Sequence, residues 1–263
     1  MLGRALKIAF WVTYDHLGKL IVVSLIWSAP AFFLASLGAI VLASQSGPAN
    51  PLLPIVLTLI VLCIALPPLS AGICELIKEL LDTRDGSLAT FWKGIRQHGL
   101  KSMAIGFIYL IAITCLTTSI AFYAWKLHDT MPLLGYGLSA LSFWCLIFVL
   151  LSAQYALPAL IQKKGGVAET IKLSAVLVLD NPFMSIGLAL NLVTVTVLVI
   201  LIPPAFFFIY GSVTCVLSMS SYEILTRKYG RENPDEPIDH KKMDEQNDYL
   251  NRGFRDFLFP WKG

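Results

Sequence analysis

The sequence predicts an all-α polytopic membrane protein with about six transmembrane helices, and three observations lead to this fold class. First, 56% of the 263 residues are hydrophobic and only 14% are charged, whereas about 25% of the residues of a soluble domain are charged. Second, the apolar residues gather in runs long enough for a helix to cross a bilayer. Third, the basic residues gather in the links on one side of those runs. Most of the chain is therefore expected to be solvated by lipid.

The predicted transmembrane domain covers residues 1–225, and its apolar runs alternate with turns and charged links. Two links, 75–101 and 161–181, are long enough to hold short amphipathic helices on the cytoplasmic side. Residues 226–263 are rich in charge and are expected to form a polar, flexible cytoplasmic tail. The six expected spans are about 20–42, 52–74, 103–125, 134–160, 182–202 and 204–222.

The first two spans have clear ends. Residues 1–19 carry basic residues and interface aromatics, so we expect a short helix that lies on the membrane surface. The span 20–42 is followed by residues 44–51, where Pro and Gly among small polar residues predict a turn. The second span, 52–74, contains adjacent prolines and is expected to bend there, because each proline removes a backbone hydrogen bond.

The link before the third span predicts an amphipathic helix. Ser87 can cap it, and four apolar residues follow at i, i+3, i+4 and i+7, which places them on one helical face. Gly99 is expected to end this helix before the span 103–125 begins. Such a basic helix fits a membrane surface or a partner, and packing against the protein's own core is an equal alternative. The candidate contact residues are Phe91, Trp92, Lys93 and Arg96.

The last three spans follow the same pattern. The span 134–160 is long and is expected to tilt, and the link after it carries a second short helical face. Pro182 suits the first turn of the fifth span, and Pro203 and Pro204 turn the chain tightly into a shorter sixth span. The alternative is one long helix kinked at the double proline. Two spans are preferred because the fifth alone has a length of about 31 Å.

The distribution of Lys and Arg predicts the orientation in the membrane. Three of these residues precede the first span, five lie in the 75–101 link, three in the 161–181 link and eight in the tail. Only Lys126, of the 20, falls on the other side. Because cytoplasmic loops are rich in Lys and Arg, both termini of this multi-pass protein are expected to be cytoplasmic.

The polar residues inside the predicted spans are few and uncharged. None of the 17 Asp and Glu residues lies deep in a span, whereas ion-coupled transporters usually need an intramembrane carboxylate or histidine. This pattern disfavours a coupled pump and leaves a facilitator open. The candidate intramembrane polar residues are Gln154, Asn191 and Thr194. Their usual role would be to bond one helix to another.

The sequence contains no motif for catalysis, metal binding or a cofactor. The four histidines lie in separate links without metal-ligand spacing, and phosphate-loop and nucleophile motifs are absent. Glu75 and Glu79, one helical turn apart at a membrane edge, could serve as an acid–base pair. Such residues are more often solvated charges at a helix end. We therefore expect no enzyme activity, no cofactor and no nucleic-acid partner.

Four short motifs are similar to those of the YesL-like family of bacterial integral membrane proteins. They are Trp27-Ser28-Ala29-Pro30, Phe91-Trp92-Lys93-Gly94, Leu157-Pro158 and Asp180-Asn181-Pro182. The resemblance covers roughly residues 10–228. Members of that family often accompany carbohydrate uptake systems. The resemblance therefore implies an accessory role near a sugar transporter in a bacterial inner (plasma) membrane, and it supplies no catalytic residues.

Two functions follow from these observations. The first is a non-enzymatic integral membrane protein that assists a partner, such as a carbohydrate transport system. The alternative is a small-solute permease or transporter component that uses the proline-bent helices. A polar cavity at mid-membrane depth would favour the permease, and an exposed apolar groove at the cytoplasmic end would favour the partner. The expected partners are the lipid bilayer and another membrane protein.

Overall fold

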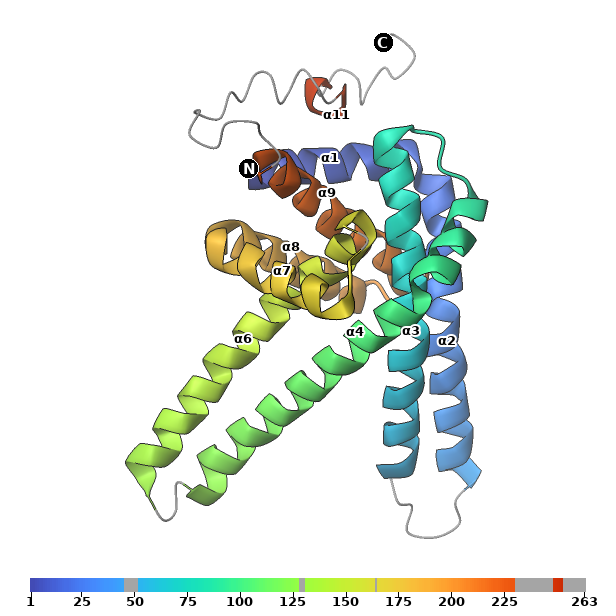
Figure 1. Ribbon diagram of the computed structural model, residues 1–263. Helices are drawn as coiled ribbons and strands as arrows, with labels where there is room; N and C mark the ends of the chain where they lie inside the picture. Colours follow the sequence, from blue (N-terminus) through green and yellow to red (C-terminus); the bar gives the residue numbers. More distant parts are fainter. Residues whose placement is uncertain (45–51, 128–130, 164, 230–247, 253–263) are drawn as a thin grey trace.

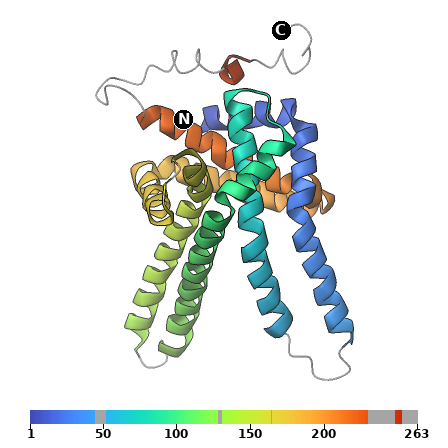
Figure 2. The same ribbon diagram turned by 45° about the vertical axis from the view of Figure 1, so that its right-hand side comes forward.

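Two long helical hairpins give the molecule its shape (Figures 1 and 2). The computed structural model describes residues 1–44, 52–127, 131–163, 165–229 and 248–252, and these residues form helices without strands. The first hairpin joins α2 (Leu17–Ser44) to α3 (Leu52–Asp82), and the second joins α4 (Leu88–Phe122) to α6 (Pro132–Lys163). Both hairpins, termed the legs, extend in the same direction and spread apart toward their far ends. The prediction of an all-α fold is confirmed.

The remaining helices gather at the end where the legs meet, and this part is termed the head (Figure 1). A short π-helix, η1 (Tyr123–Leu127), instead continues α4 at the far end of its leg. The head contains α1 (Leu2–Asp15), α7 (Val167–Asp180), α8 (Pro182–Leu201), η2 (Phe206–Tyr210), α9 (Gly211–Tyr229) and α11 (Asp248–Asn251).

Several helices are long and apolar enough to cross a bilayer. In the described part of the chain these are α4 with η1, α6, α8, and η2 with α9. A fifth is added if α1 and the first part of α2, which meet at 92°, count as one broken span. The chain thus has four to five candidate membrane-spanning helices, which indicates a membrane protein.

Large apolar side chains cover the outer surface of the second leg. Leu133 is 89% exposed, Trp125 76% and Trp144 67%. A soluble monomer rarely exposes a contiguous apolar surface of this kind, whereas such a surface is the expected boundary with lipid tails. The exposure therefore agrees with the hydropathy that predicted these spans.

A pair of glycines brings α3 and α4 into close contact in the head. A Cβ atom added to Gly94 would lie 2.6 Å from the Cβ of Glu75 and 3.1 Å from the Cα of Gly72.

Gly99 lies in the same helix, because α4 runs unbroken from Leu88 to Phe122. The predicted helix end at Gly99 is therefore wrong: this glycine is buried beside Pro68, and packing against α3 holds the helix together where sequence alone suggested a stop.

Buried serines hold α9 against α2. The Ser212 hydroxyl donates to the carbonyl oxygen of Leu20 at 2.6 Å, and the Ser212 backbone N–H donates to the Ser24 hydroxyl at 3.0 Å. One turn further along α2, Trp27 donates its indole N–H to the Ser70 hydroxyl of α3 at 2.8 Å. These hydrogen bonds satisfy polar groups that neither lipid nor apolar neighbours could satisfy.

The turn between α8 and η2 lies beside the middle of α2. Pro203 and Pro204 line an apolar cavity of about 570 Å³ together with Phe32, and the ring of Phe207 lies 5.8 Å from that of Phe32. A complete crossing by residues 182–202 would instead place this turn near the far ends of the legs. In both views α8 runs across the head rather than alongside the legs (Figures 1 and 2).

The first and last described helices pack on each other in the head. The expected surface helix at residues 1–19 is α1, but Ile8 and Trp11 are buried, and α1 packs mainly against α9. On its other side Lys7 donates to the carbonyl oxygen of Leu250 in α11 at 2.7 Å. Of the predicted tail, 226–263, the parts 230–247 and 253–263 lie outside the described residues.

Candidate functional site

The first candidate surface is a strip on the first turns of α4. Trp92 is 52% exposed, and Lys93 and Arg96 are exposed beside it. Leu100, one turn after Arg96, is 84% exposed. Phe91 is fully buried, and its ring meets that of Trp92 edge-on at 5.3 Å. Trp92, Lys93, Arg96 and Leu100 are termed the basic–aromatic strip, and Phe91 supports this strip from the protein interior.

A carboxylate and a histidine face each other below this strip. Oε2 of Glu75 lies 3.9 Å from Nε2 of His98, and both side chains are largely buried between α3 and α4. Glu79 does not join them: its Oε2 atom is buried without a hydrogen-bond partner in the described part of the chain. The expectation that Glu75 and Glu79 are solvated charges at a helix end is therefore wrong for these buried carboxylate oxygens, and Glu75 takes part in a contact between α3 and α4.

Charged and amide side chains also gather at the ends of α3, α6 and α9. The Glu223 carboxylate accepts from Arg227 Nε at 2.9 Å and from Gln162 Nε2 at 3.0 Å. Partial burial, with a further contribution from nearby Glu223, raises the pKa of Asp82, while Lys78 and Arg227 oppose this shift. The hydrogen bond from Gln162 to Glu223 thus joins α6 to α9, and Asp82 at the end of α3 lies near these charges.

The three polar residues predicted inside the spans do not converge. Gln154 donates from Nε2 to the carbonyl oxygen of Ser185 at 3.0 Å, and this bond joins α6 to α8. Asn191 donates to a carbonyl of its own helix at 2.7 Å, and Thr194 does the same at 2.9 Å. Gln154 therefore links two helices, while Asn191 and Thr194 satisfy their own helix.

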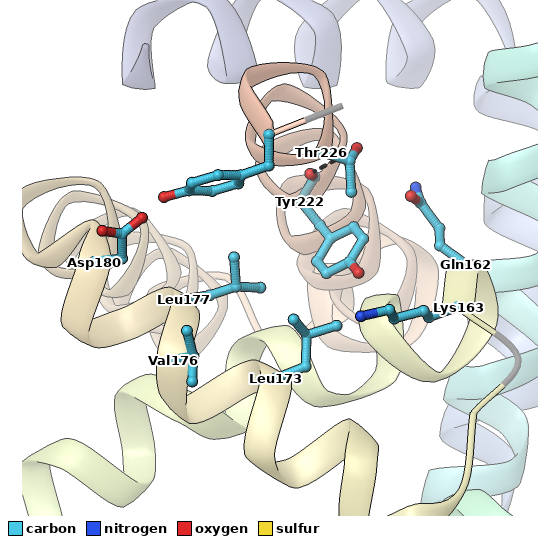
Figure 3. A pocket seen from close by; sticks show the side chains of 9 residues that line it. Gln162, Lys163, Leu173, Val176, Leu177, Asp180, Tyr222 and Thr226 are labelled. Carbon is cyan, nitrogen blue, oxygen red and sulfur yellow. Dashed lines mark hydrogen bonds between the residues drawn. The ribbon is translucent and has the colours of Figure 1, made fainter. Parts of the chain in front are cut away.

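A cavity of about 450 Å³ opens between the end of α6, α7 and α9, and it is termed the α6–α7–α9 cavity (Figure 3). Leu173, Val176 and Leu177 give it an apolar middle along α7. Lys163 extends its ammonium group into one end, and Asp180 places its carboxylate at the opposite end (Figure 3). The cavity can therefore hold an elongated molecule with an apolar part and two polar ends.

Aromatic and amide groups frame the Asp180 end of this cavity. Tyr229 lines this end from the last turn of α9, whereas Tyr222 directs its ring toward Lys163 (Figure 3). Asn181 donates to the Tyr229 hydroxyl and accepts from Lys228 Nζ at 2.7 Å. The Asp180-Asn181-Pro182 motif, which joins α7 to α8, is thereby fixed to the last turn of α9.

Sequence reasoning did not identify the α6–α7–α9 cavity. Its charged ends, Lys163 and Asp180, both lie in the 161–181 link, but Tyr222, which lines the cavity from α9, belongs to an apolar run that the sequence predicts only as a span. A tyrosine near the end of a span next to charged links was the available signal, because tyrosine is enriched at membrane interfaces. Among the described residues, no group of three or more His, Cys, Asp or Glu could hold a metal ion.

No protein-family model, curated protein or solved structure matches this chain. The resemblance to the YesL-like family therefore rests on its four motifs and stays a prediction. Two of those motifs occupy packed positions: Trp27 bonds α2 to α3, and Asn181 bonds the α7–α8 junction to α9. The structure itself supports a helical membrane protein with an exposed basic–aromatic strip and an amphipathic cavity on its head.

Proposed function

We propose that this chain is a non-enzymatic integral membrane protein that binds a second membrane protein through the basic–aromatic strip. The exposure of Trp92 beside Lys93 and Arg96 carries this proposal. Tryptophan and arginine are the residues that most often anchor protein interfaces. A half-exposed tryptophan held from behind by buried Phe91 is also pre-organised, so little rotamer freedom is lost on binding.

The proposed setting is a multi-pass protein of a bacterial inner membrane with both termini in the cytoplasm. The positive-inside distribution of Lys and Arg supports this orientation. Six apolar helices are proposed: α2, α3, α4 and α6 cross the bilayer, and α8 and α9 add a hairpin that begins and ends at the head. The basic–aromatic strip is then on the cytoplasmic side, where it meets its partner.

The chemistry of the strip defines the partner. Lys93 and Arg96 favour acidic groups, and Trp92 and Leu100 favour an apolar surface at the membrane edge. A membrane protein with acidic residues at its cytoplasmic boundary has both features. By its resemblance to the YesL-like family, we propose that this partner belongs to a carbohydrate uptake system, which makes the chain an accessory component of transport.

The alternative of a small-solute permease has less support. A permease needs polar groups that replace water along a route through the bilayer. Asn191 and Thr194 instead bond their own helix, and Gln154 bonds a neighbouring backbone. The cavity beside the middle of α2 is lined almost entirely by apolar groups, so no described feature favours transport by this chain itself.

Site-specific photocrosslinking tests the proposal. A benzoylphenylalanine at position 92, irradiated in native membranes, should give a discrete protein adduct with an integral membrane protein of a transport complex. The matched control places the same residue at Leu133, which is 89% exposed at the far end of a leg. Arg96→Ala should lower the yield at position 92 about tenfold, because a central interface arginine contributes more than 1 kcal/mol.

Two results would contradict partner binding at the strip. One is that position 92 forms adducts with lipid only, which would make the strip a membrane-surface contact. The other is that positions 92 and 133 give the same protein adducts in the same yield, which would reflect random collision in the membrane.

A further inference from the structure

We infer that the α6–α7–α9 cavity binds one phospholipid with a phosphoethanolamine headgroup. In this arrangement the Lys163 ammonium holds the phosphate, Asp180 accepts hydrogen bonds from the lipid ammonium, and the two carbons between them cross the apolar middle of the cavity, while the acyl chains leave the phosphate over the exposed apolar surface beside Val176. This site lies on α6, α7 and α9, apart from the basic–aromatic strip on α4, and it is independent of the proposed partner.

The surroundings of the cavity indicate that its ligand comes from the bilayer. Val176, in the cavity wall, is 49% exposed. Next to it Leu179 is 70% exposed and Phe183, at the start of α8, is 89% exposed. These side chains form an apolar surface that continues from the cavity to the outside of the head. An acyl chain can therefore lie on this surface and still leave its headgroup in the cavity.

The two charges in the cavity lack counter-ions of their own. Lys163 and Asp180 form no ion pair within the described residues, and the contact recorded for Asp180 is a long hydrogen bond of 3.4 Å from the Asn181 amide. Lys228, the cation at this end, donates to the Asn181 oxygen and to the Tyr229 hydroxyl. A ligand that carries both an anion and a cation would satisfy Lys163 and Asp180 together.

The length of α7 along the cavity is of the order that this headgroup needs. Lys163 enters at the Leu173 end of α7 (Figure 3), and the seven-residue rise from Leu173 to Asp180 is about 10.5 Å. A phosphate and an ammonium joined by two carbons, with a charge-assisted hydrogen bond of about 2.8 Å at each end, fill a gap of this order. The volume of about 450 Å³ lies in the usual range for ligand pockets.

The same groups discriminate between phospholipids. An anionic phosphoglycerol headgroup would place hydroxyl groups, and no cation, at the Asp180 carboxylate. A phosphocholine headgroup carries a cation there, but its trimethylammonium has no N–H to donate to Asp180 or to the nearby Tyr229 hydroxyl. The primary ammonium of phosphoethanolamine has three such donors, so the site should prefer it over both.

Native mass spectrometry of the full-length protein in detergent tests the inference. An equimolar mixture of phosphatidylethanolamine, phosphatidylglycerol and phosphatidylcholine should give mainly one bound phosphatidylethanolamine. Asp180→Asn should lower that adduct about tenfold and remove the preference over phosphatidylglycerol, because a hydrogen bond to a charged group is lost. Lys163→Gln should lower the adducts of all three lipids. Both residues are exposed, so neither variant threatens folding.

The control is Lys172→Gln, which removes an exposed lysine of α7 that does not line the cavity. It should leave the lipid adducts unchanged. Glycerophosphoethanolamine, the same headgroup without acyl chains, should not displace the lipid at equal concentration, because it leaves the exposed apolar surface of Val176, Leu179 and Phe183 uncovered.

Three results would overturn the inference. Equal loss in the Lys172 variant and in the cavity variants would mean non-specific adsorption. Displacement by glycerophosphoethanolamine at equal concentration would mean that the ligand is a free headgroup. Lipid binding that appears only after removal of residues 230–263 would mean that the chain's own tail occupies the cavity.

Discussion

Helices α6 and α9 are both apolar enough to be candidate membrane spans, yet they have opposite surroundings. In the most apolar 18-residue stretch of α6, only 6% is buried within the protein, whereas 61% is buried in the stretch from η2 to α9. The mean hydropathy of these stretches runs the other way, at 2.0 for α6 and 1.2 for the η2–α9 segment. The helix in the protein core is thus the less hydrophobic of the two.

The composition of α9 explains this difference. Four of its serines, among them Ser212 and Ser220, are buried, and Gly211 lets Trp27 of α2 approach its backbone. In a bilayer, lipid is as apolar as leucine, so helices associate through small residues and hydrogen bonds rather than through hydrophobicity. The legs expose large apolar residues to lipid, while α9 buries small and polar residues among its apolar ones.

The largest expected effect comes from filling the close contact at Gly211. A Cβ added there would lie 2.7 Å from the Trp27 ring, and the indole is held by its hydrogen bond to Ser70. Gly211→Val should therefore lower the free energy of unfolding by about 2 kcal/mol, measured by thermal or denaturant unfolding in detergent. Gly137→Val in α6 is the matched control, because a Cβ there meets no atom within 4 Å. Equal destabilisation of both variants would remove the distinction between core and leg.

A smaller effect is expected from the serine contacts. Ser212→Ala removes the hydroxyl that donates to Leu20 and contacts Ser24, and it should lower the free energy of unfolding by about 1 kcal/mol. Ser119→Ala in α4 should change it by less than about 0.5 kcal/mol, because that exposed hydroxyl only bonds a carbonyl of its own helix. A larger loss for Ser119 than for Ser212 would contradict this assignment.

Hydropathy predicted the legs well and the head poorly. The all-α fold and the apolar runs follow from composition and run length, which depend on transfer between water and lipid. Whether an apolar helix faces lipid or protein depends on its neighbours, so the buried α9 could not be distinguished from the legs. The helix stop expected at Gly99 failed for the same reason, since the packing of α4 against α3 outweighs a glycine's intrinsic preference.

The basic–aromatic strip and the cavity were also predicted only in part from the sequence. The amphipathic pattern at residues 88–95 placed Trp92 and Phe91 on one face, and the structure separates them into an exposed and a buried residue. A repeat of apolar residues every 3.6 positions identifies an apolar helix face about 100° wide. It does not show which edge of that face a neighbouring helix covers. The α6–α7–α9 cavity was beyond local patterns because Tyr222 and Tyr229, which line it from α9, are far in sequence from the link that carries Lys163 and Asp180.

The depth of the α8–η2 turn tests the division into legs and head most directly. A spin label at Pro204→Cys, in a variant whose native cysteines are replaced by alanine, can be compared in bilayers with labels at Phe32→Cys and Leu133→Cys. Pro204 lines a cavity with Phe32, at the middle of α2, whereas Leu133 is near the far end of α6. The label at 204 should match the label at 32, with high accessibility to oxygen and low accessibility to an aqueous nickel chelate. Nickel accessibility at 204 as high as at 133 would mean that α8 crosses the whole bilayer, and it would contradict a turn held at mid-depth.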